Sequence, residues 1–420
     1  MAGRKRAPAA LVVVLLIASG PACDSPPAGP PPFPSAAEAG PAAAPDSGAP
    51  DRARAPDNVT EQGEFSLARR FPRQGVLLAL ERWDATTMVV RDLATRESVQ
   101  FARKATGDTV ASLASGRLAY LVRETVNPSG NYIEVLDLGQ RHRSIRIVPA
   151  RDLAVLGFAL SPTGEHLGYA EIDLRRSRSE RVFWRIAVVD LLRRDFQVSL
   201  VPEKTHLSGG VVPVPFAWSR ATRDLYLQGL QPFRGMATQG IWSMSPNGSS
   251  LREILPEPSY TGLPRLSPDG ASLGYLSSHP ESLPRSGALA GGAPPGNVLS
   301  VMDLRTGQST IVAKETQAVF GAQTWSAAGT EIVVSRRRWL DGRFRDADLL
   351  RVERGSAAEL HPLRPPPDRV AGIEECFGSL LWVEERPGES RLVGSVSGAA
   401  PATLLALREE RIRIVGCWGA

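Results

Sequence analysis

The chain has 420 residues, of which 42% are hydrophobic and 22% are charged, proportions that exclude a largely disordered protein. The 49 Lys and Arg side chains exceed the 44 Asp and Glu side chains by five. Three of the basic residues, Arg4, Lys5 and Arg6, lie in a segment that we expect to be removed, which leaves an excess of about two. A nucleic-acid-binding protein keeps a concentrated basic surface, so we expect no nucleic-acid partner.

Residues 1–22 have the pattern of a secretory signal. The cationic start precedes an apolar run over residues 9–18, and the small residues Ser19, Gly20 and Ala22 follow it. The run is too short to cross the ~30 Å hydrocarbon core of a bilayer as a permanent helix. The segment therefore predicts export followed by cleavage.

Cys23 directly follows these small residues. The arrangement resembles a bacterial lipoprotein precursor, in which a cysteine is the first mature residue, although Gly20 stands where that motif usually carries Leu. The resemblance implies that Cys23 is lipidated and that the chain reaches a membrane through this anchor only. Ordinary signal-peptidase cleavage, which leaves the cysteine free, is the alternative. The following residues are rich in Pro, Ala and Gly and lack periodicity, so we assign residues 23–64 to the anchor and an extended tether.

From residue 65 to residue 420 the chain repeats itself at a spacing of roughly 50 residues. Each clear unit has an apolar strand that ends in Ser, a turn, and a second apolar strand. The turns Ser161–Gly164 and Ser267–Gly270 put Pro where a φ of about −65° is favoured and Gly where a positive φ is needed. The pattern is clearest in Phe158–Ala170, Phe216–Leu227, Pro264–Leu276 and Gln323–Val334.

A third and a fourth strand follow in each unit, as in Val298–Asp303 and Ser309–Val312. Four short antiparallel strands in each repeat are typical of a β-propeller blade. The repeats resemble the TolB-like family of β-propeller proteins, which carries the same Ser-Pro-Asp-Gly turn between its two inner strands. The resemblance covers most of residues 65–420 and implies the fold without implying a function. TolB has an α/β domain ahead of its propeller, and nothing between Cys23 and Phe65 could form one, so we do not expect TolB itself.

The number of units predicts seven blades. Weaker units flank the clear four, and the first, which contains Val76–Leu80, lacks an inner strand of its own. The chain also ends in an unassigned strand, Arg411–Trp418. An open ring would leave unpaired sheet edges, so we expect this C-terminal strand to complete the first blade. A ring of six blades is the alternative.

We identify no catalytic or metal-binding set and assign no cofactor. The five histidines are not spaced as metal ligands. Aspartate recurs at the end of the third strand, where we expect a structural role because a short carboxylate accepts backbone N–H groups of the following turn. These residues are Asp92, Asp137, Asp190 and Asp303.

The connections between second and third strands are long in three units, over residues 175–182, 277–296 and 336–348. Long loops on a rigid scaffold often carry function. Two of these loops are rich in Arg with aromatic residues nearby, the residue types common in interface hot spots. We expect them to form an anion-accepting, partner-binding surface, and a merely solvated set of loops is the alternative. The residues of this surface are Arg175, Arg176, Arg178, Arg336, Arg337, Arg338, Trp339, Arg343 and Arg345.

Cys376 and Cys417 are the only cysteines besides Cys23. Each precedes an aromatic residue, Phe377 or Trp418, which puts both in the same register of neighbouring inner strands. Inner strands converge at the axis, so we expect the two thiols to lie close together, and an exported protein can join them in a disulfide. Proximity without a bond is the alternative.

We interpret the chain as a cell-envelope lipoprotein, periplasmic or attached to the outer membrane, whose monomeric propeller binds a protein or an anionic glycan without catalysis. The competing hypothesis is an enzyme, such as a polysaccharide lyase or a glycosidase, with carboxylates along the axial channel. The inner strands look mostly apolar, and the adjacent Glu374 and Glu375 should face opposite ways. A structural envelope protein without a discrete ligand is a third option.

Overall fold

The computed structural model describes residues 58–64, 72, 74–82, 85–105, 111–122, 131–138, 143–149, 153–173, 175–178, 181–200, 210–232, 237–248, 251–278, 296–341, 343–353, 356–361, 363, 365–396 and 400–419. The chain divides into compact units over residues 1–53 and 54–420, and all described residues belong to the second unit. The predicted signal, Cys23 and the first part of the tether therefore lie outside the described residues.

The unit from residue 54 onward is built from seven antiparallel sheets, each of which is one blade. Within the described ranges there is no helix, and so none that is long and apolar enough to cross a bilayer. Blade 1 contains, from the axis outward, β29 (Arg411–Gly419), β2 (Gln74–Glu81), β3 (Thr86–Asp92) and β4 (Ser98–Ala105). Blade 2 contains β5 (Ala111–Ala114), β6 (Arg117–Val122), β7 (Tyr132–Asp137) and β8 (Arg143–Val148), and β1 (Asn58–Glu64) is added at its outer edge. Blade 3 contains β9 (Leu153–Leu160), β10 (His166–Asp173), β11 (Trp184–Asp190) and β12 (Asp195–Leu200).

Blades 4 to 7 follow the same order along the chain. Blade 4 contains β13 (Val212–Trp218), β14 (Leu225–Gln231), β15 (Ala237–Met244) and β16 (Leu251–Tyr260), and blade 5 contains β17 (Gly262–Leu266), β18 (Ser272–Ser277), β19 (Val298–Asp303) and β20 (Ser309–Lys314). Blade 6 contains β21 (Ala318–Trp325), β22 (Ile332–Leu340), β23 (Arg343–Glu353) and β24 (Ser356–His361). Blade 7 contains β25 (Arg369–Cys376), β26 (Ser379–Arg386), β27 (Glu389–Val396) and β28 (Ala402–Arg408).

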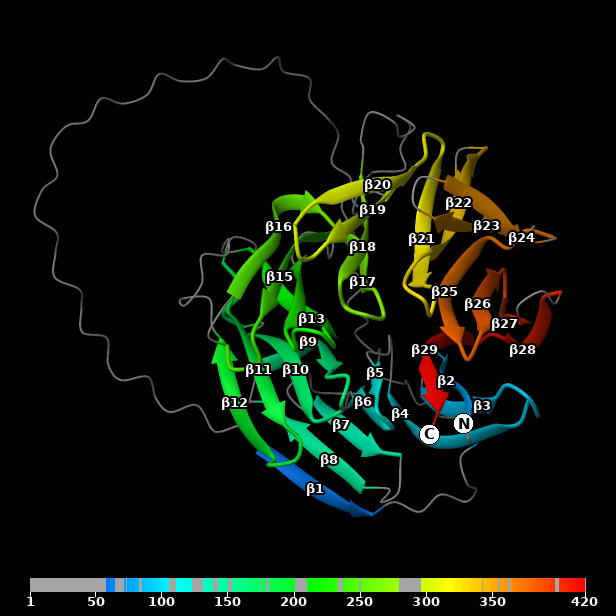
Figure 1. Cartoon of the computed structure of the whole chain (residues 1–420). Coiled ribbons are helices and arrows are strands. Elements are labelled where there is room, and N and C mark those ends of the chain that lie inside the picture. Colours follow the sequence, from blue (N-terminus) through cyan, green and yellow to red (C-terminus); the bar gives the residue numbers. More distant parts are fainter. Residues whose placement is uncertain are drawn as a thin grey trace, which may run out of the picture. The chain divides into compact units, whose positions relative to one another are not determined.

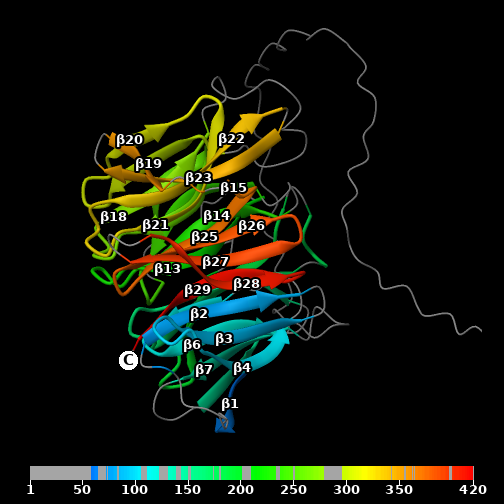
Figure 2. The ribbon, with the colours of Figure 1, turned by 90° about the vertical axis from the view of Figure 1, so that its right-hand side faces the viewer.

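The seven sheets form a closed ring, which makes this unit a seven-bladed β-propeller (Figure 1). The inner strand of every blade contacts the inner strands of both neighbours. The last link is β29, which pairs with β2 from Gly419 opposite Gln74 to Arg411 opposite Glu81 and lies beside it in Figure 2. The predicted closure by the C-terminal strand and the count of seven are confirmed, and the six-blade alternative is wrong.

The turn between the first two strands of a blade has the predicted chemistry. Gly164 has a φ of 72° and donates its N–H to the carbonyl of Ser161 at 2.8 Å. The Ser161 hydroxyl accepts the N–H of His166, the first residue of β10, at 3.0 Å. The turn at Ser267–Gly270 repeats both features. A few local hydrogen bonds thus fix each hairpin and the register of its strands.

The recurring aspartates brace the turns after the third strands. Asp303 accepts two backbone N–H groups of its turn, at 2.8 and 3.0 Å, and Asp92 and Asp190 do the same. These hydrogen bonds hold the pKa of the Asp303 carboxyl below its usual value, and the bond from Thr306 has the largest effect. The predicted structural role is confirmed for these three aspartates.

The hydrophobic core is divided into clusters that lie between the faces of neighbouring blades. Between blades 3 and 4, for example, Val188 and Leu225 are fully buried. Burial of each such side chain contributes about 1.5–3 kcal/mol. Trp218 of blade 4 also donates its indole N–H to the carbonyl of Ala159 in blade 3 at 2.9 Å. Because each blade is stabilised by its neighbours, the ring depends on being closed.

Residues 58–64, which the sequence analysis assigns to the tether, instead form β1 and pair with β8 at the outer edge of blade 2. The propeller therefore includes residue 58, and its boundary lies before residue 65. A sheet edge offers unpaired N–H and C=O groups that even a polar segment can bind. Val59 is the only aliphatic residue in β1, so hydrophobic patterning could not reveal this strand.

A disulfide joins Cys376 in β25 to Cys417 in β29, and the two Cα atoms lie 5.3 Å apart. The bond links the inner strands of blade 7 and blade 1. Beside it, Trp418 donates its indole N–H to the carbonyl of Pro72 at 2.8 Å, just ahead of β2. The C-terminal strand is therefore fixed to both sides of the closure. Of the two arrangements left open by the sequence, the structure has the bonded one.

Candidate functional site

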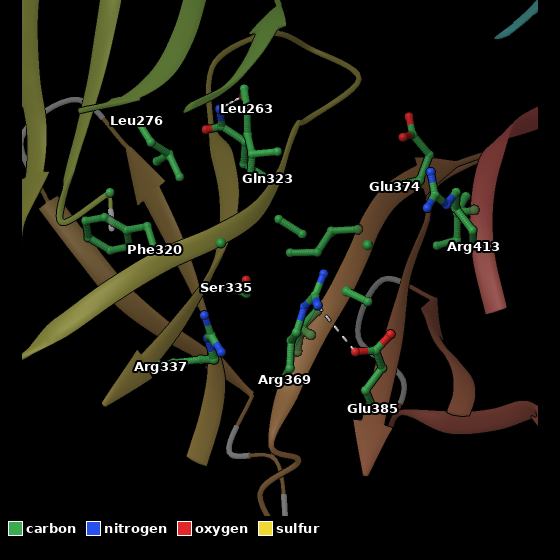
Figure 3. A pocket seen from close by; sticks show the side chains of 18 of the residues that line it. Leu263, Leu276, Phe320, Gln323, Ser335, Arg337, Arg369, Glu374, Glu385 and Arg413 are labelled. Atoms are coloured by element: carbon green, nitrogen blue, oxygen red, sulfur yellow. Dashed lines mark hydrogen bonds and ion pairs between the residues drawn. The ribbon is translucent and has the colours of Figure 1, made fainter. Parts of the chain in front are cut away.

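A cavity of about 650 Å³ lies at the inner strands of four consecutive blades, 5, 6, 7 and 1 (Figure 3). The inner strands β17, β21, β25 and β29 contribute lining residues, together with the ends of β2, β18, β22 and β26. Inner strands begin, and second strands end, on the face of the ring where the chain passes from blade to blade. The cavity is therefore on the face that also carries the connections between second and third strands.

The lining of this cavity is cationic. Five arginines and three glutamates contribute to it, and no Lys, His or Asp does. Two of the glutamates already bind arginines of the lining: Glu81 is 3.1 Å from Arg413, and Glu385 is 3.7 Å from Arg369. The charged residues are Glu81, Arg265, Arg337, Arg369, Glu374, Glu385, Arg411 and Arg413. Positive charge remains in the cavity after these pairs are formed.

Arg337 is the most buried arginine of the lining, since the other four are exposed. It extends from β22 toward the cavity, as Arg369 does from β25 (Figure 3). The half-buried side chain of Arg337 has no hydrogen-bond or ion-pair partner among the described residues. Burial, and then the charge of Arg369, lower its pKa, while the charge of Glu385 acts in the opposite direction. The side chain stays protonated at neutral pH, so a desolvated positive charge faces the cavity.

Glu374 is the third glutamate of the lining and lies in β25. The surrounding protein raises the pKa of this carboxyl by burial, although Arg265 lowers it and Glu375 adds a smaller increase. Glu375 faces elsewhere, since its carboxylate accepts the N–H of Ala327 at 3.2 Å. The two adjacent glutamates therefore diverge, as the alternation of a strand requires, and do not form a catalytic pair.

Part of the cavity wall is held in a strained conformation. Leu263 has a φ of 45°, a region rarely adopted by residues with a Cβ, and its side chain is 52% exposed. Gln323 donates an amide N–H to the carbonyl of Leu263 at 2.5 Å, and Trp325 donates its indole N–H to the carbonyl of Arg265 at 3.0 Å. Backbone strain of this kind persists only where neighbouring groups impose it, and it is common at functional sites.

The wall formed by β21 and β25 has small residues. Gly321, Ala322, Ala371 and Gly372 contribute to it. A Cβ atom added at Gly372 would meet no atom within 4 Å, so this position borders open space. A β-bulge lies at the same level in each of these strands, between Phe320 and Gln323 in β21 and between Val370 and Gly372 in β25. Bulges redirect side chains and are common beside binding sites.

The prediction of an Arg-rich loop over residues 336–348 is wrong. Residues 336–340 belong to β22 and residues 343–348 to β23, so the two strands form one long hairpin. The Arg336 guanidinium binds Asp348 at 2.7 Å and Glu315 at 2.9 Å, and Arg338 binds Asp348 at 2.7 Å. Three consecutive residues of a strand cannot share a face. Two of these arginines are neutralised by carboxylates, and only Arg337 reaches the cavity.

The remaining arginines of the predicted surface lie apart from the cavity. In the hairpin, Arg343 is exposed, and Arg345 forms an ion pair with Asp341. In the connection between β10 and β11, the Arg176 guanidinium lies 4.2 Å from the ring centre of Phe183. Arg178 donates to the carbonyls of Arg175 and Ser177 at 3.0 and 2.7 Å. The third long connection falls mostly on residues 279–295, outside the described ranges. These arginines are not brought together into one surface.

The charged residues of the cavity were not predicted from the sequence, because most residues of the inner strands are apolar. Arg265, Arg369, Arg411 and Arg413 all lie in inner strands, in three of four consecutive blades. The only signal in the sequence was that the last two inner strands, β25 and β29, both begin with Arg. In the part of the chain that the structure describes, no group of three or more His, Cys, Asp or Glu could hold a metal ion.

No family model matches the chain, and no curated protein matches it. Solved structures of β-propellers are similar to it. A protein from Lactobacillus plantarum is 11% identical with a TM-score of 0.51, and the match covers 81% of this chain and 99% of that one. At this identity the likeness supports the propeller fold alone.

Two weaker matches have TM-scores below 0.5. TolB from Acinetobacter baumannii is 16% identical with a TM-score of 0.39, over 70% of this chain and 67% of that one. A prolyl endopeptidase is 12% identical with a TM-score of 0.48 over 70% of this chain, and the chain spans only 42% of its length. The neighbours thus include TolB and other propellers, but membership of a TolB-like repeat family is not established.

Proposed function

We propose that this chain is an exported binding propeller that captures an anionic ligand in the cavity of blades 5, 6, 7 and 1. The observation that carries the proposal is the position of Arg337, half-buried at the cavity without a carboxylate partner among the described residues. A cation held there without a counter-charge costs free energy. An anion that enters the cavity offsets that cost.

The chemistry of guanidinium groups supports this proposal. Their planar fork suits a carboxylate or a phosphate, and each charge-assisted hydrogen bond contributes about 1.5–3 kcal/mol. Arg337 and Arg369 extend toward the same space, and among the described residues the ion-pair partner of Arg369 is Glu385 at 3.7 Å. Both guanidinium groups can therefore contact one acidic group.

The proposed location is the cell envelope, with the propeller anchored by lipid on Cys23. The secretory pattern of residues 1–22 and the cysteine that follows support this location. The disulfide between Cys376 and Cys417 agrees with it, because structural disulfides form and persist in oxidising compartments. In this setting the propeller acts as a monomer that binds a protein or a glycan through its acidic groups.

A propeller enzyme acting on polysaccharide is the second candidate, and one observation favours it. Glu374 lines the cavity with a raised carboxyl pKa, a property of carboxyls that donate protons in catalysis. Glu81 and Glu385, the other glutamates, each bind an arginine, which leaves no free second carboxylate for a glycosidase among the described lining residues. Glu374→Gln separates the candidates, since it abolishes turnover in an enzyme and leaves anion binding in a binding protein.

The proposal is tested by isothermal titration calorimetry of the full-length protein with short oligogalacturonate and polyglutamate at low ionic strength. Arg337→Gln should weaken the better ligand about tenfold or more, the loss expected for one charge-assisted contact. Arg305→Gln is the matched control, because Arg305 is an exposed arginine in the turn between β19 and β20. Equal affinity of the two variants, or no binding of either anion by the wild-type protein, would overturn the proposal.

A further inference from the structure

The hairpin of β22 and β23 carries three side chains of different chemistry on the face that meets the cavity. Ser335, Arg337 and Trp339 are two residues apart along β22, and alternate residues of a strand share a face. β22 is regular over this stretch, because the extra residue of the β-bulge is Asp346 of β23. Ser335 and Arg337 line the cavity. Trp339 is therefore the next side chain in the same row, beyond the edge of the cavity.

Ser335 is more deeply buried than the two residues that follow it in this row. Ser335 is 2% exposed, and Arg337 and Trp339 are both half-buried. Trp339 packs edge to face against Phe344, its partner across the hairpin, with 4.7 Å between ring centres and 66° between ring planes. The backbone N–H of Trp339 also donates to the carbonyl of Gln317 at 2.7 Å, which holds this end of β22 in place. These contacts fix an aromatic ring beside a cationic cavity.

The three chemistries together narrow the class of ligand. A lone inorganic anion would use the arginines but not the aromatic ring, and it would fill little of a cavity of about 650 Å³. A neutral sugar would use the ring and leave Arg337 unpaired. A chain of sugars that carry carboxylates uses all three groups. The carboxylate of one sugar meets the guanidinium groups, and a hydroxyl of the same sugar meets Ser335. The weakly positive C–H face of the neighbouring sugar matches the negative face of the aromatic ring.

An acidic peptide is a poorer match to this arrangement. A peptide usually gains affinity by pairing its backbone with an exposed strand edge and by placing side chains in separate pockets. Here the strand edges of β22 are already paired with β21 and β23. The small residues Gly321 and Gly372 give one continuous wall at the cavity in place of separate pockets.

We propose that the cavity and the β22–β23 hairpin bind an acidic saccharide chain, with the carboxylate of one sugar between Arg337 and Arg369 and the next sugar stacked on Trp339. This inference rests on the proposed function and deepens it, because it names the ligand class of the same cavity. Ser335 binds a hydroxyl of the sugar in the cavity. The chain extends outward along the row from Ser335 to Trp339.

Titration calorimetry of the full-length protein tests the inference with four probes: a short oligogalacturonate, its methyl ester, free galacturonic acid and polyglutamate. The oligogalacturonate should bind most tightly. Trp339→Ala should weaken that binding about tenfold and leave the affinity for free galacturonic acid unchanged, because the single sugar occupies the cavity alone. Trp339→Phe should retain most of the affinity. Phe377→Ala is the matched control, since Phe377 is an exposed aromatic residue in the turn between β25 and β26.

The outcomes separate this inference from the proposed function. If Arg337→Gln weakens oligogalacturonate while Trp339→Ala does not, the anion site stands and the saccharide assignment fails. Tighter binding of polyglutamate than of oligogalacturonate would assign the cavity to an acidic peptide and overturn the inference. Equal binding of the acid and its methyl ester would overturn both. Melting temperatures of all variants within the wild-type range keep these comparisons free of folding effects.

Discussion

Cys376 and Cys417 are 41 residues apart in sequence, and their disulfide joins the inner strand of the last blade to the strand that completes the first. In the chain-entropy model a loop of this length contributes about 3–4 kcal/mol to the free energy of unfolding. Reduction should therefore lower the melting temperature of the wild-type protein. The Cys376→Ser, Cys417→Ser double variant should melt at the lower temperature whether or not a reductant is present. Equal melting of the oxidised and reduced wild-type protein would contradict this prediction.

Deletion of residues 411–420 should unfold or aggregate the propeller. Without β29, blade 1 loses its inner strand, the edge of β2 is left open, and the inner strand of blade 7 loses its contact with β29. The contact of Trp418 with Pro72 is lost as well. Size-exclusion chromatography and thermal melting measure the effect, with a variant that lacks only residue 420 as the control. A truncated protein that melts like the full-length one would show that the closure is dispensable.

Cys23→Ala should move the protein from the membrane fraction to the soluble fraction of broken cells. The expectation follows from the lipoprotein-like signal, because a single cysteine would carry the anchor. Immunoblots of the two fractions give the result. Ser19→Ala, which leaves the cysteine in place, is the control. Retention of the Cys23→Ala variant in the membrane would require another anchor.

Glu374→Gln should make the stability of the propeller less dependent on pH. Burial raises the pKa of Glu374 in the folded state, so the folded protein binds this proton more tightly than the unfolded chain does. Ionisation therefore costs no stability below the ordinary carboxyl pKa, and the cost develops as pH rises through the raised pKa. The variant should gain stability relative to the wild type as pH rises above the ordinary carboxyl pKa of about 4.

Melting temperatures across that pH range measure the difference between Glu374→Gln and the wild type. Glu375→Gln is the matched control, because the Glu375 carboxylate accepts the N–H of Ala327 and does not line the cavity. A variant that instead loses stability as pH rises would mean that Arg265 stabilises the ionised form of Glu374 more than burial penalises it.

Gly372→Leu should block ligand binding without disturbing the fold. A Cβ atom at this position meets nothing within 4 Å, so the larger side chain has space that belongs to the cavity. Calorimetry with oligogalacturonate should show at least a tenfold loss of affinity. Ala371→Ser is the control, because it changes the same wall without filling the cavity. Gly307→Ala would not serve, because Gly307 has a φ of 72°. Undiminished binding by Gly372→Leu would place the ligand outside the cavity.

The fold could be predicted because each blade repeats a local pattern. Turn residues such as Ser161 and Gly164 lie three positions apart, so a single unit reveals them. The closure followed from two fragments, an incomplete first unit and an unassigned strand at the C-terminus. β1 could not be predicted in this way, because it is polar and is held by backbone pairing with β8.

The cavity was less accessible to prediction for a different reason. Arg337 and Arg369 come from different blades, and no local pattern relates them. The run Arg336–Arg338 resembled one basic loop, but strand alternation gives its members opposite surroundings. Asp348 holds Arg336 and Arg338 on one face, while Arg337 lies on the other. A prediction of strand boundaries in this hairpin would have separated these roles.

The pairing of β1 with β8 determines how the propeller bears mechanical load. Tension on the N-terminal side of residue 58 enters the ring at the outer rim of blade 2, through a ladder of backbone hydrogen bonds. It reaches β2, the strand next to the closure, only after that ladder has opened. The pairing of β1 with β8 therefore opens first under tension. The closure between blades 7 and 1, which the disulfide joins, is loaded only afterwards.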